Sequence, residues 1–389
     1  MINKRATLAT LAIATFGASD AHAGGADVTP MPIEIMFQKG NYAELSVARI
    51  GRDVTGTKVA PTGSMYPDYT ATTIAIKTDI GEKISIGFAD YLSAAILVDY
   101  RKAGATGATY TPYANAFVDL KIKSQLLAAK YQFDDNISIL AGVKYSSTSD
   151  ATANVLINPI GNLTIPSASG TAGAIGLAYE KPEIALRVSA LYQSATKFKL
   201  PMTSTYYTTG SKLLDGKAGL PQSATITFQS GIAKDTLAFG SIHLADWGNA
   251  QVEFDRDNCQ SPRNTYPACT KTGTAEGKLY ARSSFTKSTT YKLGIGRKLS
   301  DTYSVSATYG WEKGSGATGA SLLSTTNGNK SISLGAKYTD GPISVSAGYS
   351  HITLGDYTAD TSNTAFGNVD SVFSGNTANV IGVKIGYSF

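Results

Sequence analysis

The sequence predicts an all-β transmembrane protein, an antiparallel up-and-down β-barrel of about 14 strands with long extracellular loops. Apolar and polar residues alternate with a period of two in run after run, which is typical of strands with one apolar face. Short, turn-forming connections between these runs alternate with long ones. The chain also ends on such a run, because Ile381, Val383, Ile385, Tyr387 and Phe389 share one parity. A closed barrel buries this last apolar face in lipid.

The first 23 residues are predicted to be a secretory signal peptide. Lys4 and Arg5 precede a mostly apolar stretch, and Ala21-His22-Ala23 matches a small-residue cleavage pattern. An N-terminal membrane anchor is the alternative, although the apolar stretch is short for a span. Residues 24–40 then form a short N-terminal segment, and residues 41–389 form the barrel.

Fourteen alternating runs follow in order along the barrel region. The short connections between them consist of turn-forming residues, such as Asp134-Asp135-Asn136 and Asp340-Gly341-Pro342. Both barrel ends fall on the short-turn side, as an even strand number requires. The runs lie near 42–56, 69–79, 84–100, 117–133, 136–156, 171–181, 183–200, 222–233, 236–253, 288–299, 302–315, 329–340, 343–355 and 378–389.

Composition agrees with a barrel and limits its chemistry. Charged residues make up 16% of the chain, against about 25% in soluble domains. A net charge of +5 is too small to indicate nucleic acid binding. Cys259 and Cys269 predict a disulfide that pins one polar loop, since a metal site would need more Cys or His nearby. His243 and His351 stand in no catalytic pattern, so we expect neither an enzyme nor a cofactor.

Parity assigns faces to the runs. Tyr303, Val305 and Tyr309 should face lipid, with Tyr303, Tyr338, Tyr349 and Tyr387 at the membrane interfaces. The hypothesis for the lumen is that Lys121, Lys123, Lys144 and Arg187 receive a carboxylate; the alternative is that these charges pair with acids across the lumen. The inward set is predicted to comprise Lys77, Lys121, Lys123, Lys144, Arg187, Lys292, Lys337 and Lys384, with Asp119 and Glu312.

Three places depart from simple alternation or from ordinary loops. The third run loses its alternation at Ala94–Val98, which predicts a bulge near Asp90. The connections 157–170 and 201–221 are too apolar for plain solvent loops. They predict either an external groove for a hydrophobic ligand or packing between neighbouring loops.

One region resembles a known family. The stretches Lys181–Leu200 and Gly219–Phe228, followed by Ala245-Asp246-Trp247-Gly248, are similar to the central hairpins of the long-chain fatty acid (FadL-type) outer-membrane transporters. Leu220-Pro221 and Trp247 are the most specific features, and the likeness continues from Tyr291 to Phe389. The resemblance implies a fourteen-stranded barrel, and it implies a kink in the third strand that opens the wall sideways.

Family members also carry an N-terminal hatch with an Asn-Pro-Ala motif that plugs the lumen. Only Gly24 to Gly40 precede the first run here, and that motif is missing. The hatch is therefore expected to be shortened or missing. The piece Met31–Phe37 either enters the barrel mouth or belongs to a disordered tail.

The resemblance implies passive uptake of hydrophobic compounds across the bacterial outer membrane, above all of long-chain fatty acids. The alternatives are a general or anion-preferring diffusion porin, an uptake channel for aromatic hydrocarbons, or a surface protein whose loop 254–287 binds an external partner. Expected partners are the hydrophobic solute, outer-membrane lipid and lipopolysaccharide, and the barrel assembly machinery, which would recognise Phe389.

Overall fold

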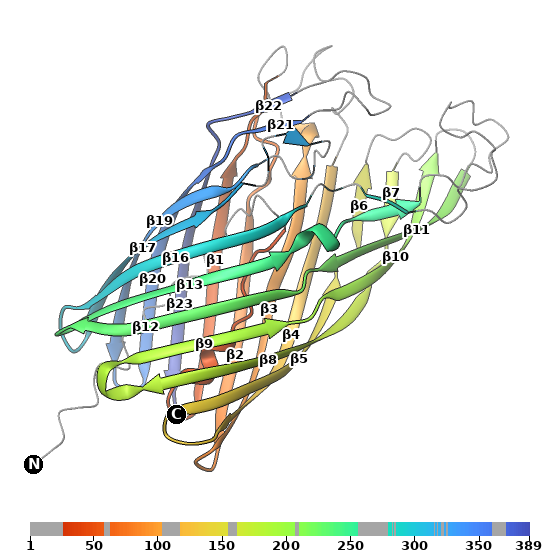
Figure 1. The fold of residues 1–389 in the computed structure, drawn as a ribbon. Coiled ribbons are helices and arrows are strands. Elements are labelled where there is room, and N and C mark those ends of the chain that lie inside the picture. The colour runs from red at the N-terminus through yellow and green to blue at the C-terminus, as the bar shows by residue number, and fades with distance from the viewer. Residues whose placement is uncertain are drawn as a thin grey trace, which may run out of the picture.

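The computed structural model describes residues 26–57, 63–102, 117–154, 162–206, 210–255, 279–281, 283, 285–314, 316, 318–319, 323, 326–359 and 371–389. Fourteen long strands form the wall of a barrel (Figure 1). They are β1 (Tyr42–Asp53), β2 (Tyr69–Ile80), β3 (Ile84–Asp99), β4 (Phe117–Gln132), β5 (Ile137–Thr148), β8 (Ser169–Lys181), β9 (Leu186–Gln193), β12 (Ser223–Ala233), β13 (Thr236–Asp246), β16 (Lys287–Lys298), β17 (Tyr303–Glu312), β19 (Asn329–Asp340), β20 (Ile343–Leu354) and β23 (Thr377–Ser388).

The barrel closes between its first and last strands. β1 pairs antiparallel with β23, from Tyr42 opposite Ser388 to Asp53 opposite Thr377. Every other neighbouring pair in the wall is also antiparallel. The β1–β23 pairing joins the two ends of the sheet, so neither the first nor the last strand has an open edge in lipid. The predicted up-and-down barrel and its strand number are confirmed.

Shorter elements extend the wall at the end with the long connections. Two hairpins there, β6–β7 and β10–β11, replace the loops predicted at 157–170 and 201–221, and β7 pairs with β10. Their alternation is hidden in the sequence by Pro201 and by glycines. The additional elements are β6 (Ala151–Asn154), β7 (Asn162–Ile165), β10 (Thr196–Tyr206), β11 (Gly210–Leu220), β14 (Glu253–Asp255), β15 (Leu279–Ala281), β18 (Thr318–Gly319), β21 (Tyr357–Ala359), β22 (Ser371–Phe373) and four 3₁₀ helices, η1 (Ile33–Phe37), η2 (Tyr100–Lys102), η3 (Pro182–Ile184) and η4 (Trp247–Asn249).

Apolar side chains cover the outside of the barrel. Leu293 is 61% exposed and Ile332 62%, although both lie in the middle of long strands. Rings flank this apolar band, with Tyr303 against Tyr338 at the short-turn end and Tyr291 stacked on Trp311 at the other. Lipid-facing bands with aromatic borders define the faces of a transmembrane barrel. Among the described residues, no helix is long and apolar enough to cross a membrane.

β2 and β3 separate halfway along the length of β3, although β3 stays paired with β4 as far as Asp99. The pairing of β3 with β2 runs from Ile84 to Tyr91, and a bulge then shifts its register on β4 between Leu92 and Ala94. The bulge therefore lies near Ser93 and not at Asp90. Beyond it both faces of β3 are buried, because Ala94, Ile96 and Val98 on one face and Leu97 on the other are each 7% exposed or less. A strand buried on both faces needs a continuous apolar run, which explains the lost alternation.

Candidate functional site in the barrel lumen

The N-terminal segment 26–40, named the plug here, lies inside the barrel (Figure 1). Ile33, Ile35 and Met36 of η1 are buried against inward side chains of the wall such as Ala75 and Leu126. Burying apolar side chains of this size stabilises the docked plug by about 1.5–3 kcal/mol each relative to exposure in water. Met31–Phe37 was predicted either to enter the barrel or to belong to a disordered tail, and in the structure it lies in the lumen.

The start of the plug takes the place that β2 vacates beside β3. The amide of Val28 donates to the carbonyl of Ser93 (2.9 Å), and the amide of Ala95 donates to the carbonyl of Ala26 (2.9 Å). Trp247, which is 1% exposed, donates its indole N–H to Asp27 Oδ2 at 2.7 Å. A charged acceptor makes this a strong hydrogen bond.

Arg187 holds the middle of the plug. Its Nη2 lies 2.5 Å from Glu34 Oε2, and its guanidinium lies over the ring of Phe37 with 4.3 Å to the ring centroid. The Arg187 side chain is only 13% exposed, whereas that of Glu34 is 47% exposed. An ion pair combined with a cation–π contact is stronger than a surface pair, because part of the arginine is desolvated.

Lys77 and Gly87 fix the end of the plug. Lys77 Nζ donates to the carbonyls of Gln38 (2.9 Å) and Gly40 (2.8 Å), and it also pairs with Asp79. A Cβ on Gly87 would come within 2.5 Å of Met36 Sδ, so a larger residue at this position would force the buried methionine to move.

A cavity of about 360 Å³ separates the plug from the opposite wall. Along β12 its lining includes Ser223, Thr225, Thr227 and Gln229. Six residues of strand span about 20 Å, so the cavity is long in the direction of the barrel axis. Its size lies within the range of about 300–1,000 Å³ of pockets that enclose small ligands.

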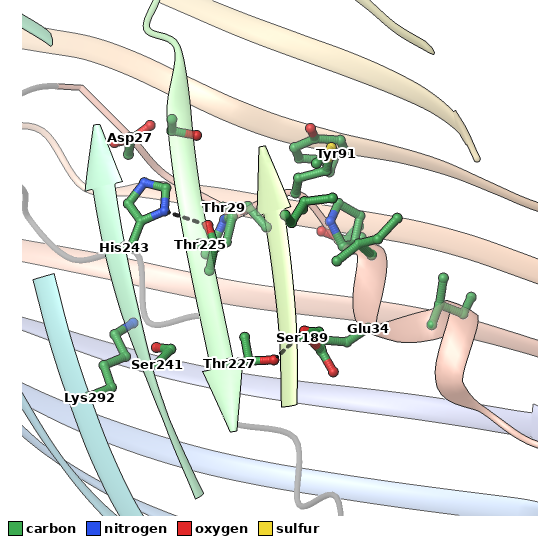
Figure 2. A pocket seen from close by; sticks show the side chains of 18 of the residues that line it. Asp27, Thr29, Glu34, Tyr91, Ser189, Thr225, Thr227, Ser241, His243 and Lys292 are labelled. Carbon is green, nitrogen blue, oxygen red and sulfur yellow. Dashed lines mark hydrogen bonds between the residues drawn. The ribbon is translucent and has the colours of Figure 1, made fainter. Parts of the chain in front are cut away.

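The lining of this cavity combines polar and apolar side chains. The wall side presents hydroxyl groups from β9, β12 and β13, with Ser189 Oγ 2.6 Å from Thr227 Oγ1 and Thr225 Oγ1 2.8 Å from His243 Nδ1 (Figure 2). The plug side presents the apolar residues from Pro30 to Ile33 together with the polar side chains of Asp27, Thr29 and Glu34. A ligand in the cavity would contact polar and apolar groups at the same time.

Of the four predicted binding residues, only Lys144 and Arg187 line the cavity. Lys144 is 2% exposed and lies toward the extracellular end, where its Nζ is 3.2 Å from Gln193 Oε1. Arg187 is six residues from Gln193 on β9, so about 20 Å of strand separates the two cations. They cannot hold one carboxylate together.

Lys121 and Lys123 are on the outside of the barrel, and their predicted place in the lumen is wrong. They share parity with the exposed Leu127, and Lys121 pairs with Asp119 on the same outer face. A 16-residue strand such as β4 is about 53 Å long and rises about 40 Å when tilted by about 40°, whereas the apolar band is about 25 Å tall. The outer face beyond the band is in water, so a lysine there does not have to point inward.

Two of the other inward lysines of the wall pair with acids. Lys384 Nζ lies 3.2 Å from Glu44 Oε2, and Lys77 pairs as described above. Lys292 and His243 both line the cavity. Among the described residues no cluster of three His, Cys, Asp or Glu side chains could hold a metal ion. Cys259 and Cys269, the signal peptide and most of loop 254–287 lie outside the described residues.

Sequence reasoning missed Asp27 and Glu34, the two acids that tie the plug to Trp247 and Arg187. Glu34 stands alone in the apolar stretch Met31–Phe37, and that isolation was the only available signal. A lone acid in a buried apolar segment needs a cationic partner, but the sequence does not say which one.

Several solved structures share this fold. No family model matches the chain, and no curated protein matches it. Among solved structures, a FadL homologue from Pseudomonas aeruginosa superposes with a TM-score of 0.73 at 12% identity, over 97% of this chain and 98% of that one. The chain has the FadL-type barrel fold.

Two other structures share the FadL-type fold with it. The toluene transporter TodX of P. putida gives a TM-score of 0.62 at 12% identity, with 92% of each chain covered. The toluene transporter TbuX of Ralstonia pickettii gives 0.61 at 12% identity, with 95% of this chain and 97% of that one covered. At such identities the likeness concerns the fold, so the cargo of this FadL-type barrel must be argued from its own residues.

Proposed function

We propose that this FadL-type barrel is an outer-membrane protein for passive, cofactor-free uptake of hydrophobic compounds. The observation that carries this proposal is the plug: residues 26–40 occupy the lumen and leave a cavity of about 360 Å³ beside them. An open diffusion porin needs a continuous aqueous channel. A plugged lumen whose cavity has apolar side chains in its lining suits a solute that binds before it passes.

The upper wall supports a sideways route for such a solute. Above Tyr91, β3 pairs with Ala26 and Val28 of the plug instead of with β2. This short pairing contains two backbone hydrogen bonds, so it opens far more readily than a full strand pair. Movement of the plug would then expose the cavity and the gap between β2 and β3 in one step.

Long-chain fatty acids are the substrate class that we propose first. The cavity is long, and its buried Lys144 could meet a carboxylate near the extracellular end while the alkyl chain extends along Pro30, Met31 and Ile33. Uncharged aromatic hydrocarbons are the second candidate, because TodX and TbuX are named as toluene transporters.

Uptake by cells that lack other transporters of this kind tests both the proposed transport of hydrophobic compounds and the proposed substrate class. Cells that express the barrel should take up a long-chain fatty acid, toluene or both faster than cells with an empty vector. Lys144→Met should slow fatty acid uptake about tenfold, the effect of losing one charge-assisted contact. Toluene uptake should stay unchanged, as should both rates in the matched control Lys123→Met on the outer face. No uptake of any hydrophobic compound, or a large steady conductance of the wild type, would refute the function. Equal slowing of both solutes by Lys144→Met would refute only the carboxylate role.

A further inference from the structure

A group of three lysines, named the lysine patch here, lies on the outer face of the barrel extension. Lys197 and Lys199 are on β10, and Lys217 is directly opposite Lys199 on β11. Phe198 and Leu200, which alternate with the first two, are 1% and 2% exposed and pack inward. Period-two alternation therefore forces all three ammonium groups to the outside.

The lysine patch carries a positive charge that the described part of the protein neutralises only in part. Like charges directly opposite each other destabilise an antiparallel pair. One carboxylate offsets part of it, since Glu253 Oε2 lies 2.7 Å from Lys217 Nζ. In the described part of the chain, no carboxylate is within salt-bridge distance of Lys197 or Lys199. Three lysines and one glutamate leave a charge of +2 on this small area.

The lysine patch lies just beyond the lipid-facing band on the side of the long loops. β10 continues directly from β9, whose outer face carries Val188 and, nearer the extracellular end, Tyr192, which are 40% and 46% exposed. Lys197 is five residues past Tyr192, which is about 12 Å higher for a strand tilted by about 40°. An amphiphile of the outer leaflet would place its acyl chains on Val188 and Tyr192 and its headgroup on the lysines.

We infer that the lysine patch binds the phosphate groups of lipopolysaccharide. This assignment rests on the outer-membrane orientation in the proposed function, where the long-loop end faces the outside. A phospholipid offers one phosphate to the surface, whereas lipopolysaccharide offers several on one rigid sugar backbone, which matches three cations held on two paired strands. Multiple charge-assisted contacts of fixed spacing favour such a polyphosphorylated ligand.

The test uses the whole barrel in mild detergent, titrated with purified lipopolysaccharide. In Lys197→Gln/Lys199→Gln/Lys217→Gln, each lost charge near a lipid surface should weaken binding several-fold, and the three together roughly a hundredfold. The matched control Lys83→Gln/Lys181→Gln/Lys234→Gln removes three exposed charges at the short turns and should bind like the wild type. Replacing the three patch lysines with arginine should preserve binding, and folded barrels of all variants should show the same heat-dependent shift in gel mobility.

Two further titrations identify the ligand chemistry. Lipopolysaccharide stripped of its phosphates should bind the wild type about as weakly as intact lipopolysaccharide binds the glutamine variant. Phosphatidylglycerol vesicles should bind at least tenfold more weakly than lipopolysaccharide. The inference is overturned if the glutamine variant binds like the wild type, if the control loses binding equally, or if phosphatidylglycerol binds as well. Should the glutamine variant fail to fold, loss of affinity on phosphate removal from the ligand decides the question with the wild type alone. Solute uptake by the glutamine variant should be normal, so failure here is separable from failure of the proposed function.

Discussion

Glu34→Gln should release the plug, because it removes the charged partner of Arg187 and little else. The substituted side chain has the same shape, but the half-buried guanidinium loses its neutralising carboxylate 2.5 Å away. Removing one partner costs about 3–5 kcal/mol for a buried pair and up to about 1 kcal/mol for an exposed one. With Arg187 13% and Glu34 47% exposed, an intermediate cost of about 2 kcal/mol is expected.

That cost should be visible as channel opening. Since each 1.4 kcal/mol is a factor of ten, 2 kcal/mol raises the population of the undocked plug about thirtyfold while that population remains small. Single-channel recording in a planar bilayer measures it as the fraction of time in a conducting state. Glu183→Gln, which removes an exposed acid at the short turns, is the matched control and should leave the recording unchanged.

A double-mutant cycle decides whether the pair itself is responsible. Arg187→Gln should open the barrel at least as much as Glu34→Gln, because it also removes the contact with Phe37. The double variant should then open no more than Arg187→Gln alone. An open fraction for Glu34→Gln within threefold of the wild type, or effects of the two substitutions that simply add, would refute the reasoning.

Three further predictions concern the barrel itself. Leu293→Arg places a charge in the lipid band and should lower the unfolding free energy by about 2–4 kcal/mol, measured by urea titration in lipid. The control Lys292→Arg, on the lumen side, should lower it far less. Equal losses for the two variants would contradict the face assignment. Removing Phe389 should lower the amount of folded barrel in the outer membrane, seen by heat-dependent gel mobility, because the terminal aromatic is the expected signal for the assembly machinery; normal assembly would exclude that role. The pKa of Asp134 is below its ordinary value because two backbone amides of its own turn donate to the carboxylate. The stabilising effect of this carboxylate is therefore present above the unfolded pKa and is lost as pH falls through the lower folded pKa. Asp134→Ala should remove this loss of stability at acid pH from the pH dependence of unfolding, and an unchanged pH profile would argue against the role of Asp134.

Strand number, turn positions and most strand faces followed from the sequence, since each depends on local alternation. The face of β4 that carries Lys121 and Lys123 is the exception. Runs such as Tyr303–Glu312 carry apolar residues at every second position, and a slip of one residue would put polar side chains into lipid. Even the failure of alternation at Ala94–Val98 was a correct local signal of an irregular strand.

Only the tertiary structure decided which charged side chains lie in the lumen and which of them are close to one another. Lys121, Lys123 and Lys144 have the same side-chain chemistry, yet the height of each along its strand determines whether the face outside is lipid or water. The pairing of β3 with the plug and the contact of Glu34 with Arg187 both join positions far apart in the chain. Alternation fixes the side of a strand on which a residue lies. The whole barrel, closed around its plug, decides how far that residue lies from the membrane edge and which segment faces it.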